Sequence, residues 1–131
     1  MNLALLQAVA VALGGAGGAL LRHAVNLWLP RSAHHPFSWA TLLVNVVGCL
    51  LAGMLVIWIS QRDASGLWRA LLLTGLMGGL TTFSAFGLDF LPLVRTQRWG
   101  WLAALVVLHV GLGLVAVIAG SRIGQSLWPQ H

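Results

Sequence analysis

Long apolar runs alternate with short polar connectors along the chain. Four runs cover residues 3–21, 38–60, 67–91 and 99–120, each close to the ~20 residues that a helix needs to cross the hydrocarbon of a bilayer. The connectors between them hold most of the turn-forming residues and much of the charge. This pattern predicts an all-α membrane protein, with four transmembrane helices forming a single domain over residues 1–131.

The composition agrees with a protein surrounded by lipid. Of the 131 residues, 59% are hydrophobic and 7% are charged, a balance that a water-soluble domain could not cover with polar surface. Most tryptophans fall at the ends of the runs, where their rings favour the headgroup level. The single cysteine, Cys49, excludes an intrachain disulfide. The arginines are spread over the span ends rather than clustered, so we expect no nucleic-acid partner.

The arginines also bear on topology. Arg62, Arg69 and Arg122 fall on the side of both termini, and a similar number falls on the other side: Arg31, Arg95 and Arg98, joined by Arg22 if it counts with them. The positive-inside rule therefore selects no orientation. A chain that inserts both ways up can assemble as an antiparallel, dual-topology homodimer with a two-fold axis in the membrane plane. We predict that assembly.

The first span carries small and polar residues on one face. Gly14 and Gly18 form a G-x-x-x-G pair, which favours close approach of another helix. Gly18, Arg22 and Asn26 follow one another at intervals of four and share a helical face. Arg22 either faces a water-filled cavity and attracts anions, or it extends to the lipid headgroups. The spacing leaves both interpretations open.

The second span begins with Ser38 as the expected N-cap and carries Thr41 and Asn45 four residues apart. An unpaired amide within a bilayer is costly, so Asn45 needs a partner. It either joins helices or faces a conduit, and the two roles are compatible.

The stretch "GLMGGLTTFSAFG" interrupts the third span. Gly78 and Gly79 weaken a helix there, and the hydroxyls of Thr81, Thr82 and Ser84 can bond backbone groups that a break sets free. We predict a break in the third helix. Unwound carbonyls at a half-helix end, with no carboxylate nearby, form a site for a monovalent cation such as Na⁺.

Phe83 and Phe86 follow on one face of the chain. Their electropositive ring edges can line the path of an anion, or the rings can pack in a core. Carboxylates near a span centre are typical of proton-coupled carriers and cation channels, whereas Asp89 lies close to the end of its span. The remaining donors and ring edges suit an anion.

The histidines carry a weaker signal. His109 stands alone in the fourth span, where a histidine is more commonly a helix-contact residue than a proton relay. His34 and His35 adjoin one another in a connector, but two neighbours without a third ligand only weakly indicate a metal site.

Three motifs, taken in order, extend over essentially the whole chain: "GGAGGALLRH" at residues 14–23, "TLLVNVVGCLLAG" at 41–53 and "GLMGGLTTFSAF" at 75–86. Together they resemble the Fluc/CrcB family of fluoride channels. The resemblance implies an antiparallel homodimer in the bacterial inner membrane, with two fluoride pores and one structural Na⁺ at the dimer interface. It also implies passive export of fluoride, which confers fluoride resistance, and no enzymatic activity.

The resemblance also assigns residues. It implies that the pore is lined by Asn45, Phe83, Phe86, Thr41 and Ser84, that Arg22 lies near an aqueous vestibule, and that the backbone carbonyls of Gly78 and Thr81 bind Na⁺. The fourth span departs from the family, because it offers His109, Gly111 and Gly113 where relatives tend to carry asparagine or hydroxyl residues. The competing hypothesis is a membrane scaffold without transport, in which every polar residue serves helix packing.

Overall fold

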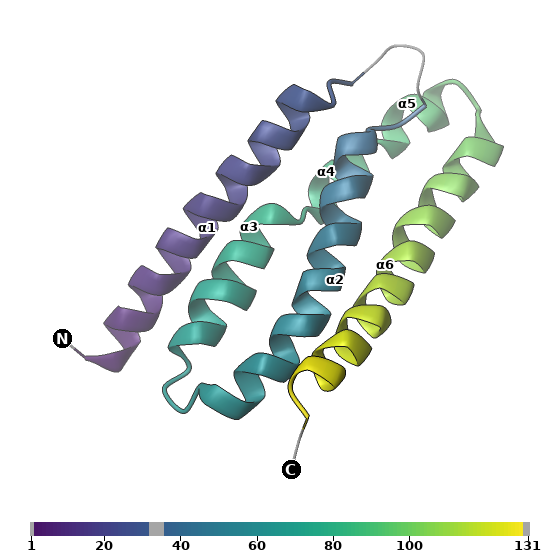
Figure 1. The fold of residues 1–131 in the computed structure, drawn as a ribbon. Coiled ribbons are helices and arrows are strands. Elements are labelled where there is room, and N and C mark those ends of the chain that lie inside the picture. Colours follow the sequence, from purple (N-terminus) through teal and green to yellow (C-terminus); the bar gives the residue numbers. More distant parts are fainter. Residues whose placement is uncertain (1, 32–35, 130–131) are drawn as a thin grey trace.

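The computed structural model describes residues 2–31 and 36–129. Within these residues, four helical segments are long and apolar enough to cross a membrane (Figure 1): α1 (Leu3–Trp28), α2 (Trp39–Arg62), a third span (Arg69–Arg95) and α6 (Trp99–Leu127). The all-helical, four-span prediction is therefore confirmed. The helices extend beyond the apolar runs, because arginine ends a run of hydropathy but favours helix.

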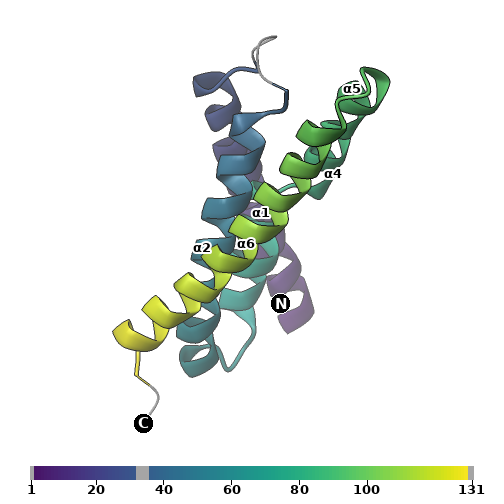
Figure 2. The ribbon, with the colours of Figure 1, turned by 90° about the vertical axis from the view of Figure 1, so that its right-hand side faces the viewer.

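The four spans pack as two tight pairs. α1 packs along the first half of the third span, and α2 packs along α6. The third span lies between α1 and α2, and α1 begins at the same end of the bundle at which α6 ends (Figure 1). In the turned view, α6 crosses α2 obliquely (Figure 2).

Glycines set the contact between α1 and the third span. A Cβ at Gly14 would overlap the carbonyl oxygen of Leu71, and one at Gly18 would overlap the carbonyl oxygen of Leu76. The two backbones are thus in direct contact, which confirms the packing role that the G-x-x-x-G spacing predicts.

The α2 and α6 pair uses the same device. A Cβ at Gly120 would overlap the carbonyl of Leu50, and a Cβ at Gly124 would press on Ile57. Backbone contact of this kind fixes helices at short range where no hydrophobic effect drives them together.

The third span is built from four helical pieces. A wide-turned π-helix, η1 (Arg69–Met77), runs into α3 (Gly78–Leu80). Thr81 and Thr82 are then extended, with φ/ψ of −81°/157° and −152°/118°. Helix resumes as α4 (Phe83–Leu88) and α5 (Phe90–Arg95). We call Thr81 and Thr82 the extended pair.

The extended pair separates two apolar clusters. Val44 of α2 packs with Met77 and Leu80, which precede the pair. The other cluster includes residues that follow it, and consists of Phe37, Leu42, Phe86, Leu93 and Leu105. Each half of the third span therefore packs in its own apolar cluster.

We expect Gly18→Ala to lower the free energy of unfolding by about 1–3 kcal/mol, because the added methyl meets backbone that cannot move aside. Gly111→Ala is the matched control, since a Cβ there meets no described atom within 4 Å. It should leave stability unchanged or raise it by up to about 1 kcal/mol through helix propensity. Thermal unfolding in detergent measures both; equal losses would contradict the packing role of Gly18.

Candidate functional site

The side chain of Asn45 pairs with the backbone of Thr82. Its Oδ1 accepts a hydrogen bond from the Thr82 amide at 2.7 Å, and its Nδ2 donates to the Thr82 carbonyl at 3.0 Å. The amide of Asn45 thus satisfies both polar backbone groups of one residue, as a neighbouring strand would. Of the two roles left open for Asn45, the structure contains the helix-joining one.

This pairing changes the fate of two carbonyls. In a continuous helix the Thr82 amide would donate to the carbonyl of Gly78, and the Ala85 amide to that of Thr81. Here the first donates to Asn45 Oδ1 and the second to Thr82 Oγ1, at 3.2 Å. The carbonyls of Gly78 and Thr81 therefore lose their helical donors.

Hydroxyls stabilise both sides of the extended pair. Thr81 Oγ1 and the Thr81 amide both donate to the carbonyl of Met77, which closes the preceding helix. Thr82 Oγ1 caps α4 and lies 3.1 Å from Ser84 Oγ. A Cβ at Gly48 would overlap the Thr81 methyl group, so α2 approaches the pair closely because position 48 is glycine.

A groove of about 210 Å³ opens beside the pair. It is lined by Asn45, Cys49, Thr81, Thr82 and Phe83. Four of these five residues offer amide, hydroxyl or thiol groups. A groove that presents amide, hydroxyl and thiol groups within an apolar span is the strongest candidate for a functional surface.

Phe83 and Phe86 occupy different environments. The Phe83 side chain is 83% exposed, whereas Phe86 is 7% exposed and belongs to the apolar core. Their ring centroids are 5.4 Å apart and the planes are inclined by 55°. Phe86 also meets Phe90 edge to face, with centroids 5.0 Å apart. Phe83 alone is presented outward.

The remaining predicted residues are only partly brought together. Ser84 joins Thr82 through its hydroxyl. Thr41 is buried in the first turn of α2, on the face that leads to Asn45. The Arg22 carbonyl accepts a hydrogen bond from Asn26 Nδ2, and the Arg22 side chain forms no hydrogen bond or ion pair with another described residue. Both interpretations of Arg22 stay open.

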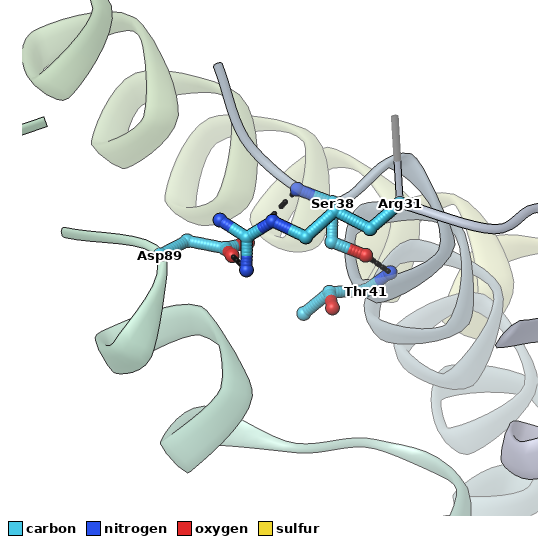
Figure 3. Close-up of polar contacts among 4 residues, drawn as sticks. All are labelled: Arg31, Ser38, Thr41 and Asp89. Carbon is cyan, nitrogen blue, oxygen red and sulfur yellow. Dashed lines mark hydrogen bonds and ion pairs between the residues drawn. The ribbon is translucent and has the colours of Figure 1, made fainter. Parts of the chain in front are cut away.

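An ion pair that sequence reasoning missed lies near the start of α2 (Figure 3). Asp89 is 1% exposed. One of its oxygens lies 2.9 Å from Arg31 Nη1, and the other accepts a hydrogen bond from the Ser38 amide at 3.1 Å. Ser38 Oγ accepts from the Thr41 amide at 3.2 Å, which confirms the predicted N-cap. Arg31 therefore does more than lie at the membrane edge. A lone carboxylate close to a span end, opposite a capped helix start, was the available signal.

His109 lies deep in the packing of α6. It is buried against Phe86, with ring centroids 4.5 Å apart and planes inclined by 35°. Its Nδ1 lies 3.1 Å from the Leu105 carbonyl oxygen. Among the described residues, no group pairs with Nε2.

The described residues contain no group of three or more histidine, cysteine, aspartate or glutamate side chains that could hold a metal ion. The weak metal pair of the sequence, His34 and His35, lies outside the described residues.

Comparison with known proteins adds the following. A family model described as "CrcB-like protein, Camphor Resistance (CrcB)" matches residues 9–121. A fluoride-specific ion channel FluC from Rhizobium johnstonii is 43% identical over 94% of this chain and 99% of its own length. Proteins of the same name from Rhizobium meliloti and Xylella fastidiosa are 44% and 40% identical, over 89% and 87% of this chain and 94% and 80% of their own lengths.

We expect Asn45→Ala to destabilise the fold, by about 1–3 kcal/mol for each polar group of Thr82 left unpaired. Asn26→Ala is the matched control, because that amide also bonds a carbonyl but is exposed on α1; its cost should stay within about 0.5 kcal/mol. Thermal unfolding of both variants in detergent measures the two losses of stability. Similar midpoints would mean that the Asn45 pairing contributes little.

Proposed function

The chain belongs to the CrcB-like family, and on this premise we propose that it is a fluoride-selective channel that exports fluoride passively and thereby confers fluoride resistance. Relatives named fluoride-specific ion channels, at 40% identity or more over most of the chain, support the assignment. The observation that carries it is the groove at the extended pair, where amide, hydroxyl and aromatic groups meet within a membrane span.

The donors in this groove suit a small, strongly hydrated anion. Each side-chain amide has two N–H groups, and within residues 2–31 and 36–129 Asn45 Nδ2 donates a single bond, to the Thr82 carbonyl. The second N–H can replace water around fluoride. The hydroxyls of Thr82 and Ser84, 3.1 Å apart, offer further donors. Several weak sites in succession allow an ion to enter and also to leave.

The two phenylalanines lie next to these donors and can receive the anion when it leaves them. A ring edge is electropositive, so it attracts an anion without binding it tightly. Phe83 is exposed beside the groove, and Phe86 packs 5.4 Å behind it. We place Thr41 on the same line, because it lies one helical turn before Asn45 on α2.

A second copy would complete the pore wall. The groove is open on a single chain, and the outward ring of Phe83 is an apolar surface beside it. The balanced arginines favour insertion both ways up, and hence an antiparallel homodimer. In that assembly Arg22 would line the approach to the pore from the water.

The same dimer would hold one structural Na⁺. The carbonyls of Gly78 and Thr81 lack their helical donors and lie beside the end of α3, where the helix dipole is negative. Uncharged carbonyl oxygens at a half-helix end suit a monovalent cation. The ion would join the two chains without taking part in conduction.

Passive conduction is sufficient for export. Hydrogen fluoride enters a cell as a neutral molecule and dissociates in a more alkaline cytoplasm, and the inside-negative potential then drives the anion outward. No coupling carboxylate is required, and Asp89 is already paired with Arg31 and the Ser38 amide. The bacterial sources of the relatives support a place in a bacterial inner membrane.

Reconstituted vesicles loaded with fluoride or chloride test the channel. The protein should release fluoride and retain chloride; retention of both would instead favour a scaffold, a function that the helix-joining bonds of Asn45 also fit.

Phe83→Ile should slow fluoride release at least about tenfold, equivalent to about 1.4 kcal/mol in the barrier, without lowering thermal stability, because the ring is outside the chain's core. Phe86→Ile should slow it too, with some loss of stability. Leu88→Ala is the control on the same helix, since Leu88 is exposed but remote from the groove. Equal release by all three variants would show that the rings are not part of the path.

Na⁺ should stabilise the dimer more than K⁺ at equal ionic strength, because an ion that binds only the assembled state shifts unfolding by mass action. Thermal unfolding midpoints in the two salts measure the difference. Asn45→Ala should reduce the preference, because it removes the two bonds that hold the extended conformation of Thr82 next to the carbonyls of Gly78 and Thr81, whereas Asn26→Ala should retain it. Identical midpoints in the two salts for the unaltered protein would exclude the ion.

A further inference from the structure

The imidazole of His109 has one satisfied nitrogen and one unsatisfied nitrogen. Nδ1 lies 3.1 Å from the Leu105 carbonyl oxygen, which can only accept, so Nδ1 carries a hydrogen. In the neutral ring Nε2 is then a bare acceptor. Nε2 is buried without a partner among residues 2–31 and 36–129. A buried polar atom left unpaired in a folded protein needs a partner, which a water molecule or an ion can supply.

Burial of the ring disfavours its charged form, and two neighbouring aromatic rings offset part of that cost. Phe86 packs against the imidazole at 4.5 Å between centroids, and Phe37 lies at 6.5 Å with an interplanar angle of 73°. An aromatic face beside a cation stabilises the charge. Phe86 is also the ring that we place in the fluoride path, so His109 touches that path through its neighbour.

Among the described residues, the charged and titratable groups around His109 provide it with no counter-ion of its own. Asp89, beside α5, is the carboxylate that acts on it electrostatically, but both oxygens of Asp89 are already paired, with Arg31 and with the Ser38 amide. On α2, the thiol of Cys49 faces Gly113, one turn further along α6. A protonated His109 is therefore a buried cation that needs an anion.

We propose that His109 is an anion-binding residue of the fluoride path, holding fluoride through Nε2–H when its ring is protonated. This rests on the proposed channel function. The proton comes from hydronium or from hydrogen fluoride; in the second case the H–F bond breaks as the Nε2–H bond forms, which leaves an imidazolium and fluoride pair. The pair is neutral overall and so avoids a lone charge in the membrane. Conduction therefore rises in acid, the condition under which hydrogen fluoride enters cells.

Fluoride current across reconstituted planar bilayers, recorded between about pH 8 and about pH 5, tests the proposal, because the neutral acid carries no current. The protonated fraction of an ordinary imidazole changes about 30-fold over this range. The fluoride current can therefore change by no more than about 30-fold through this residue. The unaltered protein should gain about threefold or more in fluoride current as the pH falls. His109→Gln, which places a neutral donor near the position of Nε2, should give a current that does not vary with pH. His23→Gln, which alters an exposed histidine on α1, should keep the full response.

The outcomes separate the two proposals. No fluoride current at any pH in the unaltered protein overturns the channel function and this site with it. A current with the same pH dependence in His109→Gln overturns the site alone. If the variant fails to assemble, the titration of His109 in the unaltered protein, followed by ¹⁵N NMR, decides. Its midpoint should rise in fluoride relative to gluconate, and an unchanged midpoint overturns the site.

Discussion

The pairing of Asn45 with Thr82 is the interaction on which the rest of the third span depends. Water is absent from the hydrocarbon of a bilayer, so every backbone amide and carbonyl there must find a partner within the protein. The extended conformation of Thr81 and Thr82 removes the usual helical partners. Asn45 supplies both bonds for Thr82, at 2.7 and 3.0 Å. Without it, the amide and the carbonyl of Thr82 would lose these two partners, and the extended conformation would lose its main support.

The glycine contacts make that pairing possible. Asn45 can reach the Thr82 backbone because Gly48, nearly one turn later on α2, admits the Thr81 methyl group. On the opposite side, Gly14 and Gly18 bring α1 onto the backbone of η1 and α3. The half of the third span that precedes Thr81 is thereby packed closely on α1, while the ring of Phe83 in α4 is exposed. Glycines therefore shape both sides of the third span. Gly14 and Gly18 allow close packing against α1, and Gly48 allows α2 to approach Thr81 beside the groove.

Hydropathy and spacing predicted a large part of this arrangement, because single-residue properties decide it. Four apolar runs suffice for four helices, and the spacing of Gly14 and Gly18 suffices for a close helix contact. The N-cap formed by Ser38 involves only Thr41, three residues later, so the sequence alone was enough to predict it. The partner of Asn45 could not be predicted from the sequence. Asn45 and Thr82 are 37 residues apart, and no local pattern indicates that their polar groups meet. Arg31 and Asp89 were missed for the same reason, because their pairing depends on how a connector folds over the end of a distant span.

A conduction path inside a bilayer must be stable when no ion occupies it. In the path that we propose, Asn45 and Thr82 meet this condition by bonding one another, and the hydroxyls of Thr82 and Ser84 do so in the same way. Groups that are already bonded to one another bind an arriving anion only weakly, and they bond one another again when it leaves. Weak binding favours passage of the ion over tight binding. His109 differs, because its Nε2 is unsatisfied in the neutral ring. Asp89 cannot compensate it, since Arg31 and Ser38 already use both carboxylate oxygens. If His109 takes up a proton, as we propose, no carboxylate among the described residues is left to neutralise it, and an anion entering the path is the partner that its Nε2–H can bind.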